Sequence, residues 1–311
     1  MHELILHHYP TSPFAEKARL LLGFKGLAWR SVTIPALMPK PDLTALTGGY
    51  RKTPVLQVGA DIYCDTALIA RRLEAHKAMP SLYPDEQAFA VQAFAQWADS
   101  TIFLYAVSLV FQPESMAARF ARLPPEAAKA FMADRGALFS GGSATRIPAE
   151  VATSQWPTLM GRLARQLERQ RGDFLFGAPS LADFALAHSL WFLRGTPVTA
   201  PWVEDYPAVA AWLDRVLGFG HGTHSPLSAE DALAIARDAE PAPLPEPDGA
   251  PLDGLRIGQR VAVAATDYGV DPVEGELVFA GLEEWVVRRE DSRAGIVHVH
   301  MPRLGFRLEA R

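Results

Sequence analysis

The chain has 311 residues, of which 49% are hydrophobic and 21% charged, and its formal net charge is −5. This length can hold two or three domains of an ordinary globular protein, and the acidic balance excludes the basic footprint of a nucleic-acid-binding protein. No apolar run reaches the roughly 18 residues that cross a membrane. The N-terminus, MHELILHHYP, lacks the charged and then apolar layout of a signal peptide. We therefore expect a cytoplasmic protein that binds no membrane.

The chain begins with a strand and a helix. Residues 2–8 contain three consecutive apolar residues and predict a short strand, which the segment 9–13 ends. Residues 14–25 then repeat apolar side chains at helical spacing. Ser12 is a natural N-cap for this helix, and Pro13 suits its first position.

The next segment predicts a second strand and then an irregular connection. Residues 28–34 contain Trp29 and Val32 among other β-formers. Residues 35–50 are interrupted by prolines and by a Gly-Gly pair, so they predict irregular structure with a short helix near Asp42.

Residues 51–74 are the most informative stretch of the chain. A Thr53-Pro54 step leads into two short strands, which the turn 59–61 joins. Asp65 and Thr66 then stand where a helix begins. Free backbone groups and an anion-attracting helix N-terminus therefore lie side by side, an arrangement that suits the two ends of a small zwitterionic peptide.

Cys64 ends the second of these strands and is the only cysteine of the chain. A single cysteine excludes an intramolecular disulfide and a cysteine metal cluster. Its position predicts a small buried apolar side chain rather than a nucleophile.

The stretch 51–74 resembles the glutathione-binding half of the glutathione S-transferase family, a thioredoxin-like fold. The resemblance implies that Pro54 is a cis-proline and that Thr53 offers its backbone to the cysteinyl part of glutathione. It also implies that Asp65 and Thr66 hold the γ-glutamyl end, with Asp65 near the ammonium. Lys40 and Lys52 are candidates for the glycyl carboxylate, with a solvated surface lysine as the alternative for each.

The same resemblance assigns the sulfur of glutathione to the start of the first helix. Ser12-Pro13-Phe14 is similar to the Cys-Pro-Phe/Tyr of thiol-type members, with Ser in place of Cys. A Ser hydroxyl and a helix N-terminus together favour a thiolate, whereas Ser cannot form the mixed disulfide of a reductase. Tyr9 is the alternative hydroxyl donor.

The middle of the chain predicts helices. Long helical patterns cover 88–109, the segment from Pro124-Pro125 to Phe139, and 156–171. Ser180 and Asp183 form a capping box before a nearly uniform apolar run, which predicts a buried helix. This box and the later Tyr206-Pro207 start resemble the helical domain of the same family, so the resemblance covers about residues 3–220. Phe103, Tyr105 and Phe111 are candidates for the substrate cleft.

The chain beyond residue 220 departs from the family pattern. A helix is expected at 228–239, a Pro-rich linker at 241–253, and several short strands between 255 and 308, which suggest a small antiparallel barrel-like module. His298 and His300 alternate on one strand face, where an ordinary surface pair is favoured over a metal site. His221 and His224 either line the cleft or lie in a polar loop.

We therefore expect an α/β thioredoxin-like domain at 1–78, an all-helical domain at 85–240, the linker, and a β-module at 254–311 typical of a bacterial subgroup. The resemblance implies a homodimeric glutathione transferase that joins glutathione to a small apolar electrophile without a metal. Isomerases and dehalogenases share these motifs. The alternative is a non-catalytic binding protein of the same fold, whose β-module recognises a partner.

Overall fold

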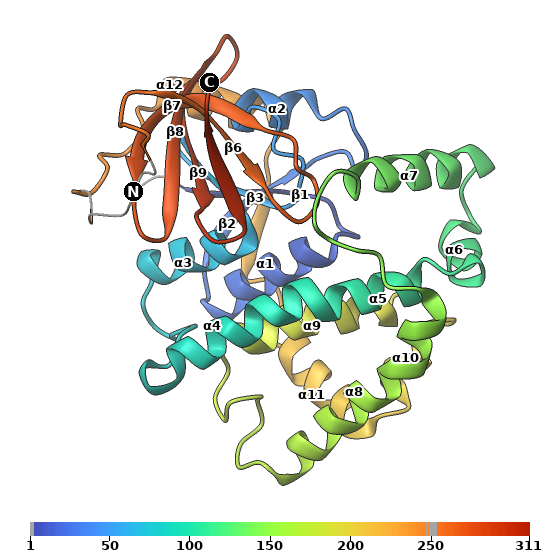
Figure 1. The fold of residues 1–311 in the computed structure, drawn as a ribbon. Coiled ribbons are helices and arrows are strands. Elements are labelled where there is room, and N and C mark those ends of the chain that lie inside the picture. Colours follow the sequence, from blue (N-terminus) through green and yellow to red (C-terminus); the bar gives the residue numbers. More distant parts are fainter. Residues whose placement is uncertain (1–2, 247, 249–253) are drawn as a thin grey trace.

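This computed structural model describes residues 3–246, 248 and 254–311, so part of the expected linker lies outside the described residues. The first part of the chain alternates strands and helices (Figure 1). Its elements are β1 (Leu4–His8), α1 (Pro13–Phe24), β2 (Ala28–Thr33), α2 (Pro41–Thr47), β3 (Val55–Val58), β4 (Asp61–Cys64) and α3 (Thr66–His76).

The alternation of side chains along these strands separates two cores. On β1, Leu4 and Leu6 pack with α1, α3 and the helical domain, whereas Ile5 packs on the opposite face. The strands are ordered β4-β3-β1-β2, with β1 and β2 parallel and the other neighbours antiparallel. This arrangement confirms the expected thioredoxin-like fold.

A helical domain follows. Its elements are η1 (Asp85–Gln87), α4 (Ala88–Trp97), the π-helical turn η2 (Ala98–Ile102), α5 (Phe103–Val110), α6 (Pro113–Phe120), α7 (Pro125–Leu138), α8 (Ala149–Arg169), α9 (Leu181–Arg194), α10 (Pro201–Glu204) and α11 (Pro207–Leu217). Helix α9 is buried along nearly its whole length, and α1 and α4 pack against it. The apolar run behind the capping box therefore lies at the centre of the molecule, as predicted.

One helical stretch, Asp85–Val110, is long and apolar enough to span a membrane by length and composition. The prediction that no segment meets this test was therefore wrong. Half of its most apolar window is buried within the protein, and a core helix passes the same test.

The C-terminal part is a β-module that continues the first sheet. Its strands are β6 (Arg260–Ala265), β7 (Val273–Ala280), β8 (Glu284–Asp291), β9 (Gly295–Pro302) and β10 (Phe306–Ala310). β6 to β9 form an antiparallel meander, and β10 pairs with β6. The parallel pairing of β9 with β4 joins this module to the thioredoxin-like part, so one ten-stranded sheet runs through both.

Two further elements connect the domains. Strand β5 (Thr223–Pro226) pairs in parallel with β2, and helix α12 (Ala229–Asp238) packs on α2 and β9. His224 therefore lies on a strand beside Trp29, and His221 hydrogen-bonds Glu16, so neither lines the cavity described below.

Candidate functional site

A large cavity of about 1180 Å³ lies where the three parts of the chain meet. Its walls come from the loop before α1, the segment 50–54, the start of α3, the helices α4 to α7 and the loops of the β-module. A pocket for one small molecule usually measures about 300–1,000 Å³. The cavity therefore has room for more than one small ligand.

Ser12 caps α1 at the wall of this cavity. Its Oγ accepts a hydrogen bond from the N–H of Ala15 at 3.2 Å, and 3% of the residue is exposed. The hydroxyl hydrogen remains free to donate, and the helix N-terminus adds partial positive charge. Tyr9 lines the same cavity, and its ring centre lies 5.5 Å from Nζ of Lys40. The two predicted hydroxyl donors to the glutathione sulfur, Ser12 and Tyr9, thus line the same cavity.

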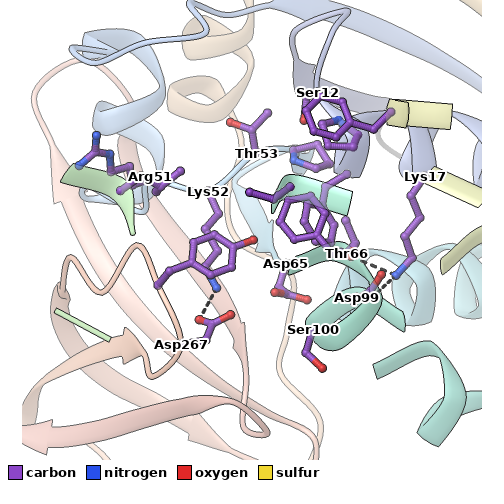
Figure 2. A pocket seen from close by; sticks show the side chains of 18 of the residues that line it. Ser12, Lys17, Arg51, Lys52, Thr53, Asp65, Thr66, Asp99, Ser100 and Asp267 are labelled. Atoms are coloured by element: carbon purple, nitrogen blue, oxygen red, sulfur yellow. Dashed lines mark hydrogen bonds and ion pairs between the residues drawn. The ribbon is translucent and has the colours of Figure 1, made fainter. Parts of the chain in front are cut away.

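Thr53 and Pro54 lie beside Ser12, as Figure 2 shows for Ser12 and Thr53. The peptide bond between Thr53 and Pro54 is cis. Among the described residues, no other backbone group hydrogen-bonds to the N–H or C=O of Thr53. This backbone is therefore available to a ligand that needs one donor and one acceptor.

Asp65 has an unusual backbone conformation. Its φ is 74°, and it is the only non-glycine residue with a positive φ in the part of the chain that the structure describes. Such a conformation costs about 1–3 kcal/mol and is concentrated at functional sites. Its carboxylate accepts a hydrogen bond from Ala67 N–H at 2.9 Å, and burial raises the pKa of Asp65.

A buried ion pair supports Thr66. Nζ of Lys17 donates to Thr66 Oγ1 at 3.2 Å and to Asp99 at 2.5 Å, and no part of Lys17 is exposed (Figure 2). Burial opposes ionisation of Asp99, but Lys17 and His188 outweigh it, so the pKa of Asp99 is lowered. Asp99 belongs to the π-helical turn, a rare conformation that often marks functional sites.

Lys40 and Lys52 differ in whether a carboxylate is paired with the ammonium group. Lys40 is buried and donates to Thr53 Oγ1 at 3.0 Å, and burial lowers its pKa to about 8. The surface alternative for Lys40 is therefore wrong. Lys52 is paired with Asp267 of the β-module at 2.6 Å (Figure 2). Its Nζ lies 4.2 Å from the ring centre of Tyr268.

The β-module closes one side of the cavity through Tyr268. This residue follows β6, and its ring stacks on Phe139 at 4.6 Å and on Phe103 at 6.5 Å. Burial raises the pKa of Tyr268 well above its usual value, and the nearby carboxylates of Asp267 and Asp65 add to this effect. The module is thus part of the site.

The helical domain provides an apolar compartment. Phe103 and Phe111 line it, as predicted, whereas Tyr105 does not and instead hydrogen-bonds Gln155. Other large apolar side chains of this wall include Val107, Val110, Met116, Phe120, Leu123, Phe131, Phe139 and Phe192.

The two histidines of β9 lie on the seam between β9 and β4. His300 is buried and hydrogen-bonds Asp61 and Glu284, so the expected surface pair is wrong for this residue. In the described ranges, no group of three or more His, Cys, Asp or Glu side chains is arranged to hold a metal ion.

Sequence reasoning missed Lys17, Asp99 and Tyr268. Lys17 follows Phe14 by three residues and precedes Leu21 by four, so it lies on the apolar face of α1. Asp99 is likewise the acid within the apolar run 88–110. A charge on the apolar face of a helix needs a partner of opposite charge, so these two positions could have indicated the Lys17–Asp99 pair. No local signal places the loop that contains Tyr268 at the cavity.

Comparison with known proteins gives one consistent family. Residues 6–88 match the family model described as glutathione S-transferase, N-terminal domain, and residues 118–215 match that of the C-terminal domain. A search of curated proteins found no match.

Solved structures extend this result. A GST-like protein from Pseudomonas syringae is 61% identical, with all of both chains covered and a TM-score of 0.85. That similarity includes the β-module. A glutathione S-transferase from Rhodospirillum rubrum F11 is 20% identical over 69% of this chain and 87% of its own, with a TM-score of 0.52. Glutathione transferase F2 from Populus trichocarpa is 13% identical over 69% and 93%, with a TM-score of 0.51. The last two show a shared fold.

Proposed function

Because the chain belongs to the glutathione S-transferase family, we propose that it is a glutathione transferase that joins the glutathione thiolate to a small apolar electrophile. The observation that carries this proposal is the position of the Ser12 hydroxyl. It caps a helix at the wall of a cavity that Thr53 and Asp65 also line.

The polar half of the cavity suits the three parts of glutathione. The backbone of Thr53 pairs with the cysteinyl residue. Asp65 accepts the γ-glutamyl ammonium, while Thr66 at the start of α3 donates to the α-carboxylate. Lys40 binds the glycyl carboxylate, because Lys52 is already paired with Asp267.

The chemistry begins with loss of the thiol proton. A hydrogen bond from Ser12 and the partial charge of the α1 N-terminus stabilise the thiolate and lower its pKa from about 8.5 toward neutrality. The thiolate then attacks the electrophilic carbon, a C–S bond forms, and either a leaving group departs with its electron pair or a proton is added.

A titration with glutathione tests the binding step. We expect calorimetry to show binding below millimolar concentration. An absence of binding at millimolar glutathione would contradict the proposal. Binding without turnover of any electrophile would favour the non-catalytic binding protein, whose β-module serves a partner.

The role of Ser12 is tested by the ultraviolet absorbance of the bound thiolate. We expect Ser12→Ala to raise the pKa of bound glutathione by about one unit, because one charge-assisted hydrogen bond is lost. Ser12→Thr keeps the hydroxyl and serves as the control. An unchanged pKa in Ser12→Ala, with a raised pKa in Tyr9→Phe, would transfer the role to Tyr9.

A further inference from the structure

The cavity continues far beyond the residues that suit glutathione. Phe14, two residues after Ser12, contacts Phe103 at 4.6 Å between ring centres. From Phe103 the wall follows α5 to Phe111, a rise of about 12 Å along the helix. At that distant end Phe111 and Phe120 both contact Phe131. An aromatic cluster thus lines the cavity at the far end of α5.

Arg119 precedes Phe120 in α6 and lines the cavity. Its guanidinium lies 4.4 Å above the ring centre of Phe192, and Nη2 donates to the carbonyl oxygen of Phe192 at 2.5 Å. Its Nε is buried and has no hydrogen-bond partner among the described residues. Burial lowers the pKa of Arg119. The side chain is therefore a partly desolvated cation with unused donors.

Most other cations that line the cavity are paired with a carboxylate, whereas Arg119 is not. Five of them form ion pairs, which are Lys17 with Asp99, Arg51 with Asp134, Lys52 with Asp267, Arg71 with Glu283, and Arg135 with Asp134. Of the described cavity-lining cations, only Lys40 and Arg119 have no carboxylate within 4.0 Å. Lys40 lies beside Thr53, whereas Arg119 contacts Phe192 of α9. The cavity thus has one uncompensated cation beside Thr53 and another against Phe192 of the helical domain.

An uncompensated cation in an apolar surrounding costs free energy, which an anionic ligand group recovers. On the premise of the proposed function, we propose that Arg119 binds a carboxylate of the second substrate. That substrate is then an elongated apolar acid. Its carboxylate lies at Arg119, its apolar body lies along the aromatic wall of the helical domain, and its electrophilic carbon lies near Ser12.

Binding of decanoate and decan-1-ol, measured by calorimetry below micelle-forming concentration, tests this assignment. The two probes share a chain of similar length and differ in charge. We expect the full-length protein to bind decanoate about tenfold more tightly than the alcohol, because an Arg–carboxylate pair is formed. Arg119→Gln removes this preference, and Arg119→Lys keeps part of it.

Two matched variants control the test. Arg122→Gln removes an exposed arginine three residues away that does not line the cavity, and it keeps the full preference for decanoate. Lys40→Gln also keeps it. Thermal melting verifies that each variant is folded, and Arg119→Lys replaces Arg119→Gln if the latter does not fold.

Several results would overturn the assignment. They are equal binding of the two probes, absence of decanoate binding, and a preference that disappears in Lys40→Gln but persists in Arg119→Gln. Glutathione titration separates this test from that of the proposed function. Decanoate preference without glutathione binding leaves the Arg119 site standing while the transferase proposal fails.

Discussion

His300 lies between two carboxylates on the seam that joins the β-module to the rest of the sheet. Its Nε2 is 3.1 Å from Asp61 Oδ1, its Nδ1 is 3.1 Å from Glu284 Oε2, and its ring stacks on Tyr63. Burial lowers the pKa of His300, but the hydrogen bonds to Asp61 and Glu284 outweigh it, so the pKa is raised above 6.5. His298, 3.9 Å from Asp61, has a lowered pKa because of burial.

The raised pKa of His300 predicts a pH-dependent stability. The imidazolium stabilises the folded state fully below about pH 6.5, the unfolded pKa, and this contribution is lost as the pH rises through the folded pKa. We therefore expect wild type to be more stable than His300→Gln at pH 6, with a smaller difference at pH 8.5. Urea denaturation at both pH values measures this difference. A difference that is constant or grows with pH would contradict the expectation.

At the scale of elements, Asp183 holds together the start of α9. Its carboxylate accepts hydrogen bonds from Leu175 N–H, Ser180 N–H, the Ser180 hydroxyl and the Trp212 indole. Burial raises the pKa of Asp183. These contacts connect two helices and a loop through one buried side chain.

We expect Asp183→Ala to destabilise the protein by about 3 kcal/mol or more, because several buried donors lose their acceptor. Ser228→Ala removes a cap of similar type from the exposed start of α12 and is expected to cost about 1 kcal/mol. Urea denaturation of the two variants gives the comparison. Equal losses would show that Asp183 acts only as a local cap.

The capping box was predictable because both of its partners lie within four residues of sequence. The helix start at Asp65 was predictable for the same reason, whereas the cis bond before Pro54 was implied by the family resemblance. The ion pair of Lys17 with Asp99 was missed, because its partners lie 82 residues apart and the sequence marks each only by a charge on an apolar helix face. The pairing of β9 with β4 joins residues more than 230 positions apart, and strand alternation alone predicted an exposed face for His300.

At the scale of the whole molecule, apolar side chains remain exposed along α4. Phe89 is 85% exposed and Trp97 is 41% exposed, and Met79 in the preceding loop is 70% exposed. Exposed apolar side chains of this size gathered in one region often mark an association surface. This region is a candidate for the homodimer contact that the family resemblance implies.

Light scattering tests the homodimer. The chain has a mass of 34.0 kDa, so we expect about twice this value for wild type. Phe89→Glu is expected to shift the mass to that of the monomer, because it places a charge in the contact. Ile257→Glu alters an exposed apolar residue of the β-module and should leave the dimer intact. A monomeric wild type would contradict the prediction.

The junction of β9 with β4 has a consequence for self-association by strand addition. Since β4 has a neighbour on each side, the free edges of the ten-stranded sheet are β10 and β5. Strand β5 is four residues long, is exposed and ends in Pro226, which cannot donate a hydrogen bond. Strand β10 carries the charges of Arg307 and Glu309. Both edges thus have features that discourage another strand from pairing and so oppose growth of the sheet by strand addition.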